Sequence, residues 1–390
     1  MKLQLRLALL VAIVGSFAVD ARAQSTVTEI VSFLVTNQAV ATGDFERDRE
    51  ASEMARQTIT GALLVNLTSV PIATSSSGFL YRLNPQLGTV ERATNSFGGF
   101  FVERALTPGH GHASFGISGS SSSFDQLDGQ DLRDGAFLTI ANRFRDEAAP
   151  FDTETLTLRV QTSTMTVYGS VGITDRFEIG GAIPFVRLSV EGERVNVYRG
   201  QTFLQASGSA TASGPADAAI RAKYTLVAGH QAGAAIAAEV RLPTGNADNL
   251  LGAGSVGYRV IGIGALEHGP LMLSGNVGLV RGGISNELYL GGAAAIAVHP
   301  RLSLTAEALA RNISELRPIE LSARPHPTAV GVETIRLIGG DPGQLIAGAV
   351  TGFKWNPGGT VVIGAHLRWA LRTAGLTAPL TPSLSVEYGF

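Results

Sequence analysis

The sequence contains no cysteine among its 390 residues, so neither a disulfide bond nor thiolate chemistry is possible. Charged side chains are also scarce, at 16% of the residues, and they nearly cancel to a net charge of −2. A chain with so little net charge gives no electrostatic reason to bind nucleic acid, and we expect no nucleic-acid partner. Glycine is abundant instead, with 47 residues. A charge-poor, glycine-rich chain with short alternating segments favours β-structure over helix.

Long hydrophobic runs are missing too, once the first residues are set aside. Stretches such as GALLVNL and LGGAAAIAV are far shorter than the ~20 residues that a membrane-spanning helix needs. The apolar run at residues 7–19 follows two basic residues and precedes a small-residue cleavage pattern that ends at Ala23. That arrangement is typical of a secretory signal peptide, and the run is too short to span a membrane comfortably. We therefore predict that residues 1–23 are a signal peptide and that the mature protein is exported.

Residues 24–110 show no steady alternation and are interpreted as a plug or periplasmic segment of mixed structure. The stretch GDFERDREASEMARQTITGALLVNL predicts a helix that Asp44 caps, and a small hairpin is predicted around Asn84-Pro85. Aromatic residues of this segment are candidates for holding an apolar ligand: Phe79, Tyr81, Phe97, Phe100 and Phe101. The alternative is that these rings only pack the plug against a wall.

From about residue 111, apolar and polar side chains alternate in short segments. In AAIRAKYTL, for example, Ile220, Ala222 and Tyr224 fall on one face, whereas Arg221 and Lys223 fall on the other. A water-soluble β-sandwich would also alternate in this way. The apolar face here includes many small alanine and glycine residues, however, and lipid fills around small side chains where a protein core needs fuller packing. The pattern therefore favours a membrane barrel.

The connections strengthen that interpretation, because short turns alternate with long polar stretches, as they do in bacterial outer-membrane barrels. Residues 191–215 and 312–343 are among the predicted long loops. The predicted fold is all-β, a transmembrane antiparallel up-and-down β-barrel of about twelve strands over residues 111–390, with an N-terminal mixed plug segment. The strands are expected near residues 112–122, 154–173, 177–190, 217–228, 231–242, 256–266, 270–281, 286–298, 301–311, 344–355, 359–371 and 382–390.

Three of these segments depart from simple alternation. In 177–190 the apolar positions change from odd to even after Phe185, which indicates either a bulge at Pro184 or a strand that leaves the membrane there. The segment 154–173 changes in the same way, so its outer half is expected above the bilayer. Segment 256–266 barely alternates and is the weakest of the predicted strands.

The last residues, SLSVEYGF, place Leu384, Val386, Tyr388 and Phe390 at every second position. We interpret them as the closing strand of the barrel, with lipid on the apolar side. Tyr388 and Phe390 are the expected assembly signal through which the barrel-assembly machinery acts. The expected location is the outer membrane of a Gram-negative cell, with outer-membrane lipid as a partner.

Three stretches carry a resemblance to a known family: SFGGFFVERALTPGHG at residues 96–111, YGSVGITDRFEIGGAIPFV at 168–186 and VRLPTGNADNLLGAGSVGY at 240–258. They resemble the outer-membrane transporters named for the meta-pathway of phenol degradation, which are similar to the fatty-acid and aromatic-hydrocarbon channels. The resemblance implies a monomeric barrel with an N-terminal plug that passes small hydrophobic molecules inward.

Charged side chains opposite the apolar faces are predicted to line the lumen. They are Arg159, Glu178, Arg221, Lys223, Glu239, Arg241, Glu287, Glu307, Arg311, His366, Arg368 and Glu387. Both signs occur, so neither a strong anion filter nor a strong cation filter is indicated. These residues are either contacts on the path of a ligand or charges that only keep the interior wet and bind the plug.

No catalytic set stands out. The stretch HGHASF offers His110, His112 and Ser114, but at the periplasmic start of the first strand, whereas barrel lipases work at the outer rim. The aspartates of DQLDGQDLRDG lack EF-hand spacing, and GAGSVG has no following helix that could bind a phosphate. We expect no enzymatic activity, no metal and no cofactor.

The function predicted from the sequence is a channel for passive uptake of small hydrophobic or aromatic solutes, gated by the N-terminal segment. The alternative is a structural or adhesive outer-membrane barrel without transport activity.

Overall fold

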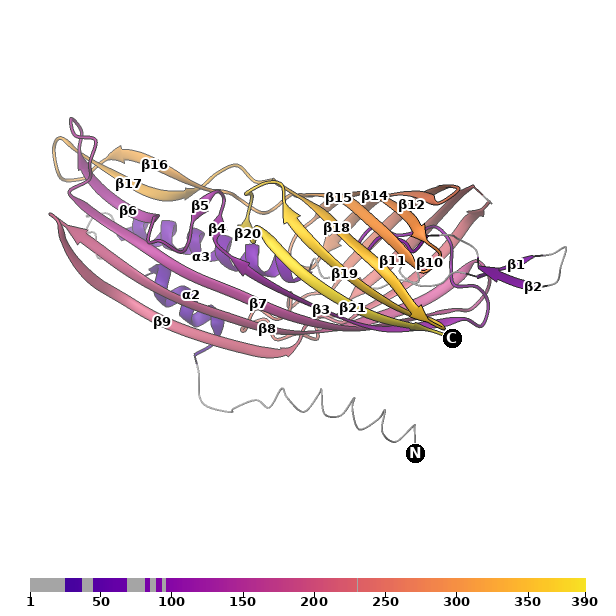
Figure 1. Ribbon diagram of the computed structural model, residues 1–390. Helices are drawn as coiled ribbons and strands as arrows, with labels where there is room; N and C mark the ends of the chain where they lie inside the picture. The colour runs from indigo at the N-terminus through magenta and orange to yellow at the C-terminus, as the bar shows by residue number, and fades with distance from the viewer. Residues whose placement is uncertain (1–24, 37–44, 69–80, 85–88, 93–95, 230) are drawn as a thin grey trace.

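Twelve antiparallel strands close into a barrel (Figure 1). Their order around the barrel is β7-β3-β21-β19-β18-β15-β14-β13-β12-β11-β10-β8, and β8 pairs with β7 to close it. The strands are β3 (Ala113–Phe124), β7 (Asp152–Gly172), β8 (Phe177–Tyr198), β10 (Ala219–Ala228), β11 (Ala232–Arg241), β12 (Gly257–His268), β13 (Leu271–Gly282), β14 (Glu287–His299), β15 (Leu302–Ile313), β18 (Gln344–Gly358), β19 (Val361–Ala370) and β21 (Leu380–Gly389). Each predicted segment overlaps one of these strands, so the predicted all-β barrel of about twelve strands is confirmed.

The computed structural model describes residues 25–36, 45–68, 81–84, 89–92, 96–229 and 231–390. The predicted signal peptide, residues 1–23, lies outside these ranges. Within them, no helix combines the length and the apolar character needed to cross a membrane.

The two ends of the barrel differ. Short connections, such as residues 173–176, 269–270, 300–301 and 359–360, join strands at the end where the chain terminates (Figure 1). Most connections at the opposite end are longer, and four of them contain further strands. We call these the short-turn end and the long-loop end.

The outer face of the barrel is apolar and its inner face is polar. On β13, Leu273 and Val277 point outward and are 45% and 51% exposed, whereas Ser274 and Asn276 point inward and are 8% and 6% exposed. Most of the other barrel strands repeat this arrangement, with exposed leucine, isoleucine, valine and aromatic side chains on the outside. The barrel is therefore inverted relative to a water-soluble protein, in which the large apolar side chains would be inside.

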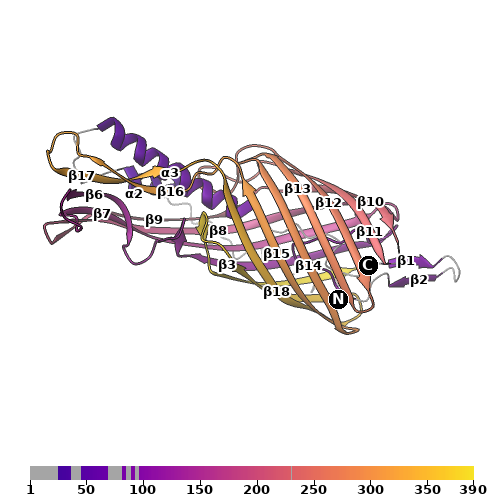
Figure 2. The ribbon, with the colours of Figure 1, turned by 90° about the horizontal axis from the view of Figure 1, so that it is seen from above.

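Strands β7 and β8 continue beyond the barrel at the long-loop end and carry a second sheet (Figures 1 and 2). There the order is β16-β17-β6-β7-β8-β9. The added strands are β6 (Phe137–Phe144), β9 (Gln201–Pro215), β16 (Ile319–Pro325) and β17 (Val332–Gly339). We call this sheet, with the upper parts of β7 and β8, the extension.

The extension corrects the prediction that residues 191–215 and 312–343 are loops. Residues 191–215 form the upper end of β8 and all of β9, and residues 312–343 contain β16 and β17. The alternation in β9 is carried by small residues, because Ala206, Ala210 and Ala212 are buried between serine, threonine and glycine neighbours. Such a strand has little hydrophobic contrast, which is why its sequence is typical of a loop.

Helices α2 (Val27–Thr36) and α3 (Phe45–Thr68) lie against the inner face of the extension (Figures 1 and 2). Leu34 of α2 and Leu63 of α3 belong to the same buried cluster as Leu158 of β7 and Leu188 of β8. Helix α3 lies where a helix is predicted. The extension therefore has a conventional apolar core, which these helices complete.

Helix α2 was not predicted, although its start carries a recognisable signal. Thr26 Oγ1 accepts a hydrogen bond from the Glu29 N–H at 3.1 Å, and Glu29 Oε2 accepts one from the Thr26 N–H at 2.8 Å. This reciprocal pair is a capping box, which occupies N–H groups that the helix leaves without partners. The helix itself, VTEIVSFLVT, is rich in β-branched residues, which are more typical of strands.

Two small sheets complete the described structure. Strands β1 (Tyr81–Asn84) and β2 (Thr89–Arg92) form the predicted hairpin, which lies beyond the short-turn end (Figures 1 and 2). Strands β4 (Gln126–Leu127), β5 (Gln130–Asp131) and β20 (Leu376–Thr377) form a three-stranded sheet.

In β7 and β8 the apolar residues change from odd to even positions because the outer face of both strands changes from apolar to polar. Their register runs without a shift past Pro184, so the alternative of a bulge at that residue is wrong. On the outer face, the rung formed by Met165 and Phe185 is followed by the rung of Ser163 and Arg187. The outside thus changes from apolar to polar on both strands at the same level. At this level the partner of β8 changes from β10, which pairs with it as far as Ala182, to β9, which pairs with it from Phe185. That the strands leave a membrane there, the other alternative, stays a prediction.

Candidate functional site

Residues 96–110, which we call the inner segment, run inside the barrel before the chain enters β3. Ser303 Oγ of β15 accepts a hydrogen bond from the Phe97 N–H at 2.9 Å. Four residues further along β15, the Glu307 carboxylate accepts the N–H groups of three consecutive residues of the segment, residues 100–102. Both side chains point inward because they occupy odd positions of β15, whose even positions face out.

Lysine and threonine side chains hold the carbonyl groups of the same segment. Lys223 Nζ of β10 donates to Leu106 O at 2.9 Å, and Thr225 Oγ1 donates to Ala105 O at 2.7 Å. Lys354 Nζ of β18 donates to Gly99 O. The segment forms neither helix nor strand and so leaves backbone groups without partners of its own, which the barrel wall supplies.

An aromatic side chain of the inner segment fits a hollow in the wall. The Phe100 ring lies 4.2 Å from the His366 ring, between centroids, and Lys354 Nζ lies 4.5 Å from its centre. A Cβ atom at Gly352 or Gly364 would come within 2.8 Å or 2.9 Å of this ring. Glycine at these two positions therefore makes room for Phe100.

The predicted aromatic candidates of the N-terminal region take different places. Phe97 is fully buried in the barrel, and Phe100 and Phe101 are half-buried on the inner segment. Tyr81 belongs to β1, and Phe79 lies outside the described residues.

Eleven of the twelve charged residues predicted to face the lumen lie on the inner face of the barrel. They are Glu178, Arg221, Lys223, Glu239, Arg241, Glu287, Glu307, Arg311, His366, Arg368 and Glu387. The prediction for Arg159 is wrong. Its side chain is exposed on the outer face of the extension, 3.9 Å from Glu191, because the inner face of β7 consists of even-numbered residues throughout.

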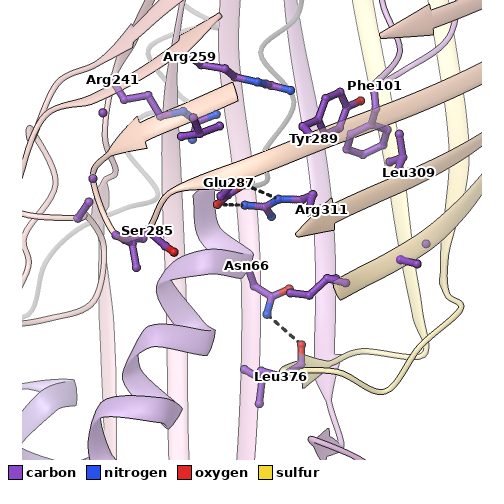
Figure 3. Close-up of a pocket in the computed structure, with 18 of the residues that line it drawn as sticks. Asn66, Phe101, Arg241, Arg259, Ser285, Glu287, Tyr289, Leu309, Arg311 and Leu376 are labelled. Carbon is purple, nitrogen blue, oxygen red and sulfur yellow. Dashed lines mark hydrogen bonds and ion pairs between the residues drawn. The ribbon is translucent and has the colours of Figure 1, made fainter. Parts of the chain in front are cut away.

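A cavity of about 180 Å³ lies between the inner segment and the end of α3 (Figure 3). Phe101 borders it from the inner segment, and Asn66 borders it from α3. The Asn66 side chain donates to Leu376 O at 2.9 Å, which ties the helix to the loop that precedes β21. The N-terminal region thus closes the cavity on two sides.

Charged residues on neighbouring strands share one level of the cavity wall. Arg221, Glu239 and Arg259 are direct cross-strand neighbours on β10, β11 and β12. Arg221 forms an ion pair with Glu103 of the inner segment. Glu239 is 2.9 Å from Arg241 and 3.8 Å from Arg259. Opposite charges directly across a sheet attract, so the register itself builds this network.

Further round the wall, an ion pair lies beside an arginine that contacts an aromatic ring. Arg311 makes two hydrogen bonds to the Glu287 carboxylate, at 2.9 Å and 2.6 Å. The Arg259 guanidinium lies 4.6 Å from the centre of the Tyr289 ring. Figure 3 shows Tyr289, Phe101 and Leu309 close together on the right and Arg241 and Arg259 to their left.

A smaller cavity of about 60 Å³ lies on the other side of Phe101. It shares Asn66, Phe101 and Arg368 with the first cavity. Hydroxyl groups dominate its remaining wall: Ser118, Ser120, Ser122, Thr162, Thr164, Thr166, Thr381 and Ser383. Phe101 therefore separates an arginine-rich chamber from one lined mainly by hydroxyls.

Several residues of the site were not predicted. Arg259 lies on the weakly alternating segment 256–266, where Ile261 and Ile263 face inward and pack against Ala105 of the inner segment. Because the inner face of this strand is apolar as well, apolar and polar residues do not alternate along it, and Arg259 was not predicted to face the lumen. Lys354 shares its side of β18 with Gly352 and lies between outward Phe353 and Trp355, a signal that could have identified it.

The candidate catalytic and metal-binding stretches have structural contacts. His110 Nδ1 lies 2.7 Å from Ile173 O, and the His110 N–H donates to Asp175 at the short-turn end. Asp128 accepts the N–H groups of Ile319 and Gly375 at 2.8 Å and 2.7 Å, which joins the extension to the barrel. No three His, Asp or Glu side chains in the described ranges are arranged to hold a metal ion.

Comparison with known proteins finds no matching family model and no matching curated protein. Solved structures with similar chain traces include an outer-membrane channel from Pseudomonas putida F1, with 11% identity and a TM-score of 0.45 over 72% of this chain and 96% of that chain. The transport unit of the autotransporter AIDA-I from Escherichia coli has 12% identity and a TM-score of 0.38 over 85% and 99% of the two chains. OmpF from Salmonella typhi, in complex with daunomycin, has 8% identity and a TM-score of 0.30 over 72% and 98%.

Proposed function

We propose that this protein is an outer-membrane channel of a Gram-negative cell for passive uptake of small hydrophobic or aromatic solutes, with the N-terminal region as its gate. One observation carries the proposal. A closed barrel exposes large apolar side chains on its outside while its inside holds ion pairs around a cavity. In a bilayer, a closed barrel leaves no backbone group without a partner, and lipid covers the apolar face.

The edges of the apolar face support insertion in a membrane. Phe353, Trp355, Tyr388 and Phe390 are exposed on the outer face near the short-turn end, where aromatic girdles meet the membrane surface. At the other edge, Arg187 marks the level at which the outside of β8 becomes polar. Tyr388 and Phe390, whose ring centroids are 5.9 Å apart, belong to the terminal strand that we propose the barrel-assembly machinery recognises.

The contacts of the inner segment support its role as a gate. It is held by hydrogen bonds and ion pairs from β10, β15 and β18, and none of these contacts is covalent. The segment closes the lumen below the cavity. A solute would enter from the long-loop end, occupy the cavity, and pass when part of the segment moves aside.

A reversible disulfide cross-link tests the gate. Because the chain contains no cysteine, two introduced cysteines can pair only with each other within the molecule. A Cβ atom at Gly233 would lie 3.0 Å from the Cβ of Ala105, and the Cβ atoms of a disulfide are about 3.5–4.5 Å apart, so a small shift suffices. We expect the Ala105→Cys/Gly233→Cys variant, oxidised in vesicles, to lose uptake of phenol-sized solutes and to recover it on reduction.

Each single-cysteine variant is the matched control, because it carries one substitution and cannot form the internal cross-link. Uptake that is equal in the oxidised and reduced double variant would contradict gating by this segment and leave the channel intact. Absence of uptake in every form, including the unsubstituted chain, would contradict the channel and favour the structural or adhesive alternative.

A further inference from the structure

We propose that the larger cavity is a binding site for a small amphipathic monoanion, with a carboxylate at one end of a flat apolar body. This inference rests on the proposed channel function, because it names the class of solute that the channel holds. It also changes the expectation from the sequence, in which the lumen charges indicated no preference for either sign.

The charges that line the cavity are unequal. Six arginine and four acidic side chains of the described residues border it. Glu103 and Glu287 each neutralise one arginine, Arg221 and Arg311. The Asp217 carboxylate instead accepts the backbone N–H groups of Gly245 and Ala253, one on each oxygen. The wall therefore has an excess of positive charge that an anion would balance.

Arg259 is an arginine of this wall whose hydrogen-bonding capacity is little used by the described residues. It shares Glu239 with Arg241, and its closest approach to that carboxylate is 3.8 Å, which is too long for a hydrogen bond. Its Nε atom is buried and has no hydrogen-bond partner among the residues that the structure describes. A buried donor without a partner is costly, and a carboxylate accepts two parallel N–H groups from one guanidinium. An anion at this position would satisfy donors that are otherwise unused.

The rest of the cavity fits an apolar body. The rings of Phe101 and Tyr289 and the side chain of Leu309 lie together beside Arg259 and Arg311 (Figure 3). Ile346 and Leu376 add further apolar surface. A flat ring can stack against the aromatic side chains while its carboxylate points to the guanidinium of Arg259. Neither a bare inorganic anion nor a neutral hydrocarbon would use both features.

Three isosteric probes separate charge from shape. Benzoate, benzamide and benzamidine each join a phenyl ring to a planar head group, with a charge of about −1, 0 and +1 at neutral pH. We expect calorimetric titration of the full chain in detergent to show that benzoate binds about tenfold more tightly than benzamide. Benzamidine should not bind measurably, and added salt should weaken benzoate but not benzamide.

Substitutions of single arginines test which residue causes the preference for benzoate. Arg259→Gln should reduce benzoate affinity about tenfold, to the level of benzamide, while benzamide affinity stays unchanged. Arg241→Gln is a second variant at the same wall and should lower benzoate affinity in the same direction. Arg159→Gln is the matched control, because that arginine is exposed on the outside of the extension.

The outcomes distinguish this inference from the channel proposal. Equal binding of benzoate and benzamide, no binding of either, or an unchanged preference in both arginine variants would overturn the anion site. Competition by chloride as strong as by benzoate would also overturn it, because it would show a site for simple anions. If benzoate binds as expected but no probe enters vesicles, the site stands and the channel proposal fails.

Discussion

The barrel and the extension are built partly from the same two strands, yet their polarity is opposite. In the barrel half of β8, Ile183 faces outward and Glu178 faces inward. In the extension half, Arg187 faces outward and Leu188 faces inward. The backbone is continuous between the halves, so the difference comes from what covers each face. We attribute the apolar outside of the barrel to lipid and the polar outside of the extension to water.

The insides differ because they hold different forms of the N-terminal region. The extension encloses helices, which satisfy their own backbone hydrogen bonds and present apolar side chains such as Leu34 and Leu63. The barrel encloses a segment that is neither helix nor strand, whose N–H and carbonyl groups need partners from residues such as Glu307 and Lys223. The secondary structure of the enclosed chain thus decides whether the enclosing wall is apolar or polar.

The largest effect is expected from a charge placed inside the extension. Leu158 is 1% exposed and packs in the core with the helices, so Leu158→Asp would bury a carboxylate without a partner. Such substitutions destabilise by more than about 4 kcal/mol. We expect proteases to cleave α2 and α3 in this variant while the barrel remains folded, as judged by its heat-dependent migration on gels.

Arg159→Asp is the matched control for that experiment, because the neighbouring residue points to the opposite side. Arg159 is exposed and its approach to Glu191 is 3.9 Å, so the substitution should leave protease resistance almost unchanged. Equal sensitivity of the two variants would contradict the orientation of β7 described above.

The next effect concerns the outer face on either side of the boundary. Ile183→Arg puts a charge where we propose that lipid lies, which costs about 2–4 kcal/mol near the middle of a bilayer. Arg187→Ile, four residues along on the same face, should be nearly neutral because water covers that position. Urea unfolding of both variants in lipid vesicles measures the difference. A charge at 183 that is tolerated as well as the change at 187 would show that lipid does not cover this face.

Most of the barrel could be predicted from the sequence because its signals are local. The residues of most strands show which side faces outward, and Leu273, Ser274 and Val277 show this within five positions. The change of β7 and β8 from an apolar to a polar outer face could also be predicted, since the polarity of one strand changes along its length. Strand β9 was not, because alanine and serine differ too little in hydrophobicity to reveal two faces.

The cavity was predicted only in part because its chemistry depends on distant pairs. The lumen-facing parity identified Arg221 and Glu239, but Glu103, the partner of Arg221, lies 118 residues earlier in a segment without alternation. The weak signal of β12 has the same origin, since Ile261 is apolar to suit Ala105. The sequence of one strand does not indicate which residues of the inner segment contact it. The excess of arginine at the cavity therefore could not be predicted from any single strand.

A smaller effect is expected from weakening the polar contacts of the inner segment. Glu307→Gln removes a charge that accepts three N–H groups, and hydrogen bonds to a charged group contribute about 1.5–3 kcal/mol. The amide retains one acceptor, so the barrel should fold while the segment is released more often. We expect solute uptake by vesicles to rise about tenfold, the lower end of that range. Glu191→Gln, on the exposed outside of the extension, is the control, and equal uptake in both would contradict the role of Glu307.

The smallest effect is expected where the barrel passes into the extension, at the loop between β15 and β16. Hydrogen bonds from the Ser285 hydroxyl and from Asn286 hold the pKa of the Glu315 carboxyl below its usual 4.5. Because this pKa is lowered in the folded state, the stabilising contribution is present above pH 4.5 and is lost as the pH falls through the lowered value. Glu315 is exposed, so solvent screens the contact and only a local effect is expected. Hydrogen exchange at Asn286, corrected for its intrinsic rate, should therefore accelerate on acidification. The same measurement on Glu315→Gln should show no such pH dependence, and a parallel acceleration in that variant would assign the change to another group.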